Sequence, residues 1–168
     1  ESVTANRLGQ SGLWPHAISG DQPIVLARFA RPSDLDLAGE LIRAHAYWRR
    51  CGLVADLVLL NDAEPAHELH DLLEELVRLG PTADLSDKPG GVFLRTAGGM
   101  PAEDVVLLEA AARAILRGDA GSLAAQLDQA PAPDTLPADL PVTAATKTPT
   151  PDKSSAAGEA LLFANGLG

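Results

Sequence analysis

The chain has 168 residues, and 23 acidic against 13 basic side chains give it a formal net charge of −10 at pH 7. This length suits one ordinary domain with a real hydrophobic core, and the negative field disfavours nucleic acid and anionic membrane surfaces as partners. A single cysteine and the absence of a run of about 18 apolar residues lead us to expect a reducing, cytoplasmic location and no membrane-spanning segment.

Three strand-like segments alternate with three helix-like segments between Pro23 and Leu127, which predicts parallel βα units. The first expected strand, 23–29, is almost continuously apolar, as in a parallel strand covered on both faces. Apolar residues recur every three or four positions in the segment that follows, which predicts an amphipathic helix. Ser33 is a suitable N-cap for it, and Gly52 is a suitable residue just beyond its end.

The second expected strand covers 55–60, and an amphipathic helix follows it. The third strand covers 91–95, and the next helix should start at Pro101 and run to Gly118. Ser122 should cap a short helix that ends near Gln129. The expected core consists of large apolar side chains: Ile24, Leu26, Leu41, Trp48, Val58, Leu60, Leu72, Leu76, Val92, Leu94 and Leu108.

The pattern therefore predicts an α/β domain at 23–129, a small three-layer structure with a three-stranded, mainly parallel sheet and three to four helices. Residues 1–22 are expected to form an extended flank. Residues 130–168 should form a proline-rich connection followed by an apolar segment. Sheet order and oligomeric state stay open.

No nucleotide cofactor is expected, because Gly9, Gly12 and Gly20 precede the first strand, whereas a dinucleotide fingerprint needs its glycines just after it. No G-x-S-x-G elbow occurs either, so no nucleophilic triad can be assigned. We expect no catalytic residue and no cofactor in this chain.

Three histidines are candidate metal ligands by their spacing. His67 and His70 lie three apart on an expected helix, and His45 lies on the helix before it. Zinc sites need three or four convergent ligands, and the sequence provides no further one nearby. The pattern therefore favours solvated or cap-proximal histidines, with a metal site as the alternative.

In an open parallel sheet, ligands bind beside the carboxyl ends of the strands. Polar side chains and glycines at those ends, with the acid of the Ser19-Gly20-Asp21 turn, form the candidate ligand-binding set: Asp21, Arg31, Asn61, Asp62, Arg95, Thr96, Gly98 and Gly99. The alternative is an ordinary set of loops, and for Asp21 an ordinary turn entering the first strand.

Residues 8–26, LGQSGLWPHAISGDQPIVL, resemble a segment of bacterial cyclic β-1,2-glucan synthases, where a similar L-W-x-x-x-I-S-G-D-x-P-I-V-L run occurs. Further stretches resemble the same family in the same order: 44–49, 56–61, 89–93 and 163–168. The resemblance covers nearly the whole chain apart from the proline-rich connection, and both ends of the chain look like cuts within it.

This resemblance implies a large bacterial inner-membrane enzyme of carbohydrate metabolism. In that family a membrane-embedded glucosyltransferase is joined to a cytoplasmic region similar to glycosyltransferase family 36, now classed with the glycoside phosphorylases of family 94. The family's catalytic acid lies in a G-D-W-N-D-G-like motif, and no such motif occurs in this chain. No catalytic role can therefore be transferred to it.

Two hypotheses follow. The first is a non-catalytic module, on the cytoplasmic side of the membrane, that joins and orients other domains of the same polypeptide. The second is a module that binds a glucan or a sugar phosphate at its strand-end loops. In both cases the isolated chain is expected to be inactive.

Overall fold

The computed structural model describes residues 2–63 and 68–129, so the expected proline-rich connection and the apolar segment lie outside the described residues. Within these ranges a parallel sheet of four strands forms in the order β3-β2-β1-β4. The strands are β1 at Ile24–Phe29, β2 at Asp56–Asn61, β3 at Val92–Thr96 and β4 at Ala112–Arg117. The predicted α/β class and parallel sheet are confirmed, with one strand more than expected.

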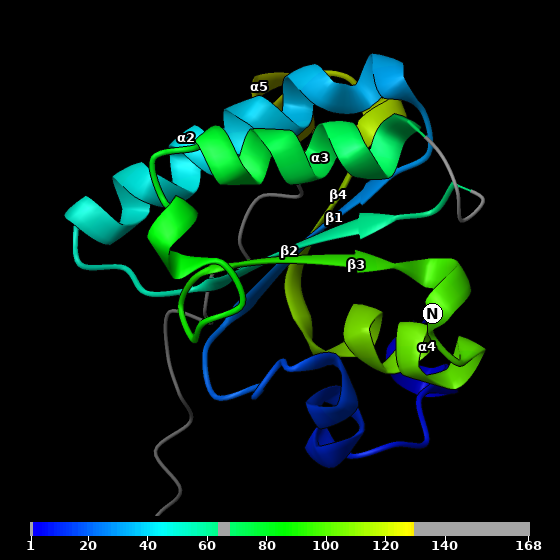
Figure 1. Ribbon diagram of the computed structural model, residues 1–168. Coiled ribbons are helices and arrows are strands. Elements are labelled where there is room, and N and C mark those ends of the chain that lie inside the picture. Colours follow the sequence, from blue (N-terminus) through cyan, green and yellow to red (C-terminus); the bar gives the residue numbers. More distant parts are fainter. Residues whose placement is uncertain (1, 64–67, 130–168) are drawn as a thin grey trace, which may run out of the picture. The chain divides into compact units, whose positions relative to one another are not determined.

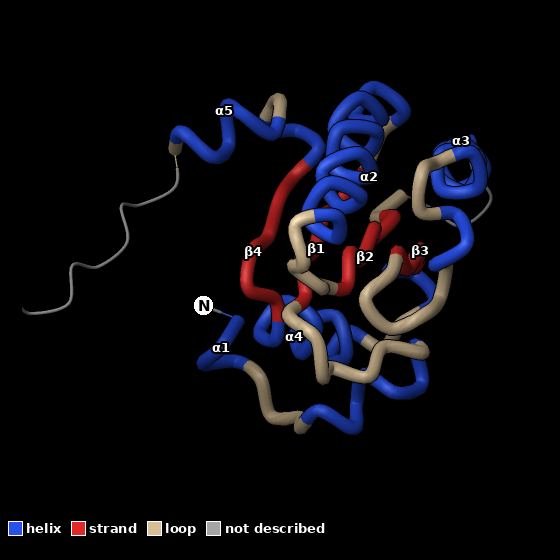
Figure 2. The backbone as a smooth tube through the Cα atoms, turned by 90° about the vertical axis from the view of Figure 1, so that its left-hand side faces the viewer, coloured by secondary structure: helices blue, strands red, loops and turns tan. Residues whose placement is uncertain are grey.

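Helices cover both faces of the sheet (Figures 1 and 2). On one face lie α2 and α3, while α4, α1 and the 3-10 helix η1 lie on the other. The α-helices are α1 at Ser2–Ala5, α2 at Leu35–Arg50, α3 at Glu68–Leu79, α4 at Ala102–Ala111 and α5 at Leu123–Asp128. The 3-10 helices are η1 at Gln10–His16, η2 at Pro32–Asp34, η3 at Ala83–Leu85, η4 at Ala97–Gly99 and η5 at Gly118–Ala120.

Each face of the sheet has its own apolar core, because successive side chains of a strand point to opposite faces. In β1, Ala27 and Phe29 pack with α2 and α3, whereas Ile24 and Leu26 pack with α4 and η1. The middle strand β2 is buried along its whole length. Most of the predicted core residues are buried, and four of them are only half-buried: Trp48, Leu72, Leu76 and Leu94.

The segment before β1 differs from the extended flank that we expected. Leu13 and Ile18 are buried in the core beneath the sheet. The Nε2 atom of His16 lies 2.8 Å from Oδ2 of Asp104 on α4, and both side chains are nearly buried. The backbone of Gly12 comes so close to α4 that an added Cβ would lie 2.7 Å from Leu107. Residues 2–22 are therefore an integral layer of the domain.

The predicted helix from Pro101 to Gly118 is wrong in its second half. The helix ends at Ala111, Ala112 takes up extended backbone angles, and residues 112–117 become β4, which pairs in parallel with β1. Without β4, one edge of β1 would leave its backbone hydrogen-bonding groups unpaired in a mostly apolar setting. Pairing with β1 thus outweighs the helix propensity of the Ala-Arg-Ala-Ile-Leu-Arg sequence.

The helix caps agree with expectation in part. Ser122 caps α5, since its side chain accepts a hydrogen bond from the Ala125 amide. Gly52 has φ of +84°, as suits a glycine just beyond a helix. The predicted cap Ser33 lies instead within η2. Asp34 precedes α2, and its carboxylate accepts hydrogen bonds from the backbone amides of Ala30 and Arg31.

Candidate functional site

The strand order changes direction between β1 and β4, so the carboxyl ends of these strands form the switch point at which open α/β sheets commonly bind ligands. A cleft of about 130 Å³ opens there. Its charged side chains form ion pairs with one another. Arg28 donates two hydrogen bonds of 2.8 Å to Asp62, Arg31 lies 3.6 Å from Asp34, and Arg117 lies 3.2 Å from Asp119.

Arg28 also pairs with Glu109 of α4. Its guanidinium therefore links Asp62, which follows β2, to the helix α4. The neighbouring carboxylates, Asp62 first among them, raise the pKa of Arg28. The switch-point cleft is therefore small, and its charges are neutralised within the domain. It brings together only two residues of the predicted ligand set, Arg31 and Asp62.

The other strand-end residues of the predicted set do not line this cleft, and the polar side chains among them have structural partners. Asn61 is buried and accepts a hydrogen bond from the Ala63 amide at 2.9 Å. Arg95 donates to the His16 carbonyl and to Asp87, both at 2.7 Å. Thr96 lies 3.4 Å from His70. Gly98 and Gly99 are exposed in η4. The residues on and after β3 do not form one pocket with Arg31 and Asp62, because β3 is separated from β1 by β2. Asn61, at the end of β2, does not line that cleft either.

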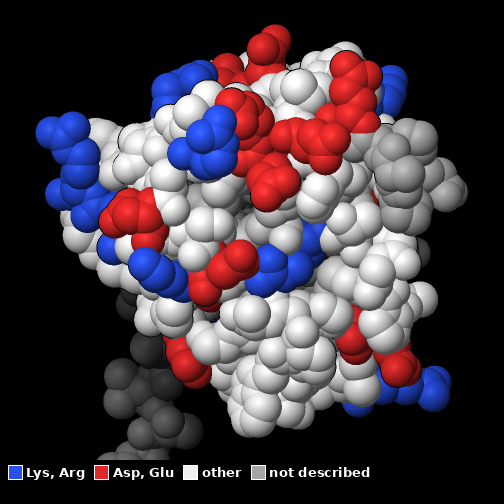
Figure 3. Space-filling view, in the orientation of Figure 1, with Lys and Arg blue, Asp and Glu red and all other residues white. Residues whose placement is uncertain are grey.

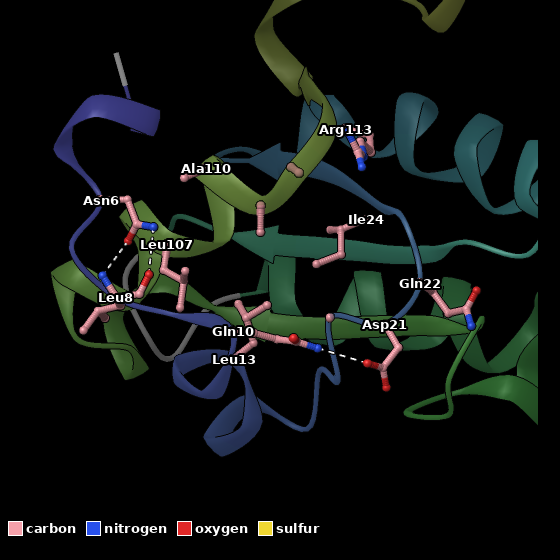
Figure 4. A pocket seen from close by; sticks show the side chains of 13 residues that line it. Asn6, Leu8, Gln10, Leu13, Asp21, Gln22, Ile24, Leu107, Ala110 and Arg113 are labelled. Atoms are coloured by element: carbon pink, nitrogen blue, oxygen red, sulfur yellow. Dashed lines mark hydrogen bonds between the residues drawn. The ribbon is translucent and has the colours of Figure 1, made fainter. Parts of the chain in front are cut away.

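A larger cavity, of about 530 Å³, lies at the opposite, amino edge of β1 and β4 (Figure 4). It contains the predicted ligand residue Asp21, in the loop that enters β1. Apolar side chains of the N-terminal segment, β1 and α4 form its floor: Leu8, Leu13, Ile24 and Leu107. Polar side chains also line it: Asn6, Gln10, Asp21, Gln22 and Arg113.

The loop of Asp21 is held in place by a network that starts from Gln10. The Gln10 amide donates to the Ser19 carbonyl at 2.8 Å and to Asp21 Oδ1 at 3.0 Å, and the Ser19 hydroxyl accepts from the Asp21 amide. Gly20 between them has φ of +74°, and an added Cβ there would lie 2.9 Å from Gln10 Cγ. The Ser19-Gly20-Asp21 turn is thus packed directly against Gln10, which presents the Asp21 carboxylate to the cavity.

Gln10, Gln22 and Arg113 were not among the sequence-predicted site residues. Gln10 lies within the string of residues 8–26 that resembles glucan synthases, and this was the one available signal for it. No sequence signal indicated Arg113, because a helix was expected there; it is instead the second residue of β4, beside the start of β1. Within the described ranges, the side chains of Gln22 and Arg113 have no hydrogen-bond or ion-pair partner.

A second polar feature at this end of the sheet is buried. The expectation of a solvated or cap-proximal His45 is wrong, because this side chain lies within α2, is fully buried, and its Nε2 donates to the Ala55 carbonyl at 3.0 Å. Its Nδ1 and the Oδ2 atom of buried Asp56 lack hydrogen-bond partners among the described residues. Burial lowers the pKa of His45 and raises the pKa of Asp56.

No three His, Cys, Asp or Glu side chains gather as a metal site in the part of the chain that the structure describes, and His67 lies outside that part. Over the same residues, no helix has the length and apolar character needed to cross a membrane. Acidic side chains gather over α2 and α3, whereas the face formed by α4 and the N-terminal segment carries fewer charges (Figure 3).

No protein-family model matches the chain. Over 133 residues it is 35% identical to the cyclic β-(1,2)-glucan synthase NdvB of Rhizobium meliloti (strain 1021), and this match covers 77% of the chain. The match spans 5% of the length of that synthase, so the chain corresponds to a small part of a much longer relative. The chain is therefore a glucan synthase-like segment, as the order of its motifs predicted.

Proposed function

We propose that this segment is a non-catalytic module of a larger glucan-synthesising enzyme, in which it joins and orients other domains of the same polypeptide. The observation that carries the proposal is how its charged groups are used. At the carboxyl edge of β1 and β4 they form ion pairs with one another, and the cavity at the amino edge holds one carboxylate, Asp21. Cleavage of glycosidic bonds commonly needs two carboxylates, or one acid with a phosphate site.

The activity of the larger enzyme in this proposal is glucosyl transfer or β-glucan phosphorolysis, carried out by other domains on the cytoplasmic side of a bacterial inner membrane. The similarity to part of a cyclic β-(1,2)-glucan synthase supports this assignment. The net charge of −10 supports a role without nucleic acid or direct membrane contact.

Binding of a glucan or a sugar phosphate at the strand-end loops is the second candidate. It has less support, because Arg31, Asp62 and Arg95 already hold partners within the domain. A ligand there would have to compete with ion pairs that the fold itself uses.

The direct test measures turnover by the purified chain. Incubation with linear β-1,2-glucooligosaccharides and phosphate should release no glucose 1-phosphate, and incubation with a nucleotide sugar should transfer no glucose. Turnover that is present in the chain and lost in Asp21→Asn would contradict the proposal.

In the NdvB synthase, deletion of the matched segment should abolish glucan synthesis, and supplying the segment as a separate chain should not restore it, since a linking module acts only within the polypeptide. Full synthesis after deletion would equally overturn the linking role.

A further inference from the structure

The cavity at the amino edge of β1 and β4 combines an apolar floor with polar groups that lack partners. Its volume, about 530 Å³, lies within the range of about 300–1,000 Å³ that is usual for small-molecule sites. The side chains of Arg113 and Gln22 have no partner among the described residues. Of the two oxygens of the Asp21 carboxylate, only Oδ1 accepts a hydrogen bond from a described side chain. The cavity therefore offers donors and an acceptor that the fold does not use.

The charges in the cavity limit the chemistry of its ligand. Asp21 opposes an anionic ligand, and Arg113 opposes a cationic one. A hydroxyl group can donate to the Asp21 carboxylate and can accept from the Arg113 guanidinium, and the amide of Gln22 can do either. A neutral ligand that carries several hydroxyl groups therefore matches the hydrogen-bonding chemistry of all three side chains.

The side chain of Trp14 is bound to the loop that carries Asp21. The Trp14 indole donates from Nε1 to the Ser19 carbonyl at 3.3 Å, and Gln10 donates to the same oxygen. Although that hydrogen bond holds it, Trp14 is 62% exposed, which is unusual for so large an apolar surface. Its exposed surface is therefore free to pack against the apolar face of a sugar ring held at the Asp21 loop.

We propose that this cavity binds a short, neutral oligosaccharide, with Asp21 and Arg113 holding its hydroxyl groups and Trp14 covering one sugar ring. Figure 4 shows how the site is assembled: Gln10 and Asp21 point toward each other from the N-terminal segment, and Arg113 comes from the start of β4. The choice of a β-1,2-linked glucan as ligand rests on the proposed function.

Isothermal titration of the whole chain with linear β-1,2-glucotriose tests the proposal, with glucose 1-phosphate as the anionic comparison. We expect saturable binding of the trisaccharide, and binding of glucose 1-phosphate that is weaker by at least about tenfold, which corresponds to about 1.4 kcal/mol. Equal or tighter binding of glucose 1-phosphate would overturn the inferred neutral ligand, and the lack of saturable trisaccharide binding would overturn the site.

Variants locate the ligand on the molecule. Arg113→Ala, Asp21→Asn and Trp14→Ala should each weaken trisaccharide binding by about tenfold or more. Arg117→Ala is the matched control, because Arg117 lies on the same strand at the opposite edge of the sheet and is exposed like Arg113. It should bind like the unchanged chain.

Urea unfolding of each variant shows whether that variant is still folded. Backbone amide NMR shifts of the unchanged chain provide a second measurement that needs no variant. In the unchanged chain, the trisaccharide should shift the amides of Gln22, Ile24 and Arg113 and leave those of Asp62 and Arg117 in place. The reverse pattern would place the ligand at the carboxyl edge and overturn the proposal. Catalytic turnover would contradict the proposed linking role without affecting this binding site, so the two failures are distinguishable.

Discussion

The guanidinium of Arg95, on β3, donates from Nε to the carbonyl oxygen of His16 at 2.7 Å and thereby ties the edge of the sheet to the N-terminal segment. The same side chain pairs with Asp87 and lies 5.4 Å from the centre of the Phe93 ring. Its surroundings are largely buried, with 18% of the Arg95 side chain exposed. Arg95 is therefore a structural clamp in a position where the strand-end rule predicted a ligand-binding group.

Arg95→Ala should lower the free energy of unfolding by about 1–3 kcal/mol, because it removes a charge-assisted hydrogen bond to a backbone carbonyl that becomes unpaired. Urea unfolding measures this change. Arg78→Ala serves as the control, since Arg78 pairs with Glu75 on the exposed face of α3 and should leave the unfolding midpoint unchanged. Equal effects of both substitutions would show that the clamp contributes nothing.

His45 should make stability depend on pH. Burial lowers the pKa of His45 in the folded state, Arg49 lowers it further, and an unfolded histidine titrates near about 6.5. The unfolded chain therefore binds the additional proton first, and stability is lost as the pH falls below about 6.5. Asp56 acts with the opposite sign: its pKa is raised in the folded state, so its contribution is present at low pH and lost as the pH rises through that value.

The measurement is the urea midpoint at about pH 7.5 and about pH 5.5. The unchanged chain should lose more stability over this interval than His45→Gln, whose amide can still donate to the Ala55 carbonyl. Asp56→Asn retains the histidine and should still lose stability toward acid. A His45→Gln variant with the same loss as the unchanged chain would assign the pH dependence to other groups.

Gly118→Ala should destabilise the packing of η5 against Asp34, the last residue of η2. A Cβ at this position would lie 2.5 Å from Asp34 Cβ and 2.6 Å from its carboxylate, and Asp34 is fixed by its hydrogen bonds to backbone amides. Overpacking of this kind costs about 1–3 kcal/mol. Gly9→Ala is the control, because it has open space around it and an extended backbone, and thermal unfolding should separate the two variants.

Gly20→Ala should cost more than Gly52→Ala, although both glycines have positive φ values, +74° and +84°. The backbone conformation alone costs a non-glycine residue about 1–2 kcal/mol, and Gly52 has open space. At Gly20 the added Cβ also meets Gln10 Cγ at 2.9 Å. In a Gln10→Ala background the additional cost should fall, and a double-mutant cycle by urea unfolding measures it. A cost that is independent of Gln10 would contradict the close packing of this turn.

Much of the fold could be predicted from local patterns. The apolar runs of β1, β2 and β3 contain more consecutive buried residues than a one-sided strand would show, and this identified a parallel sheet covered on both faces. The stripes of α2 and α3 likewise follow the helical period and pack on one core. These features depend on neighbours a few residues apart, so they can be read from the sequence.

The fourth strand and the amino-edge cavity depend on contacts between distant parts of the chain, and only the tertiary structure decided them. Helix propensities differ by less than about 1 kcal/mol per residue, which is too little to keep residues 112–117 helical when β1 offers a hydrogen-bonding edge. That pairing brings Arg113 to the cavity of Asp21, 92 residues earlier (113 minus 21). Long-range hydrogen bonds also give two predicted ligand residues a structural role: Asp62 accepts from Arg28, and Arg95 donates to the His16 carbonyl. Local sequence determined the strands β1 to β3 and the layer of α2 and α3, and the partners available across the sheet determined which polar groups were left for a ligand.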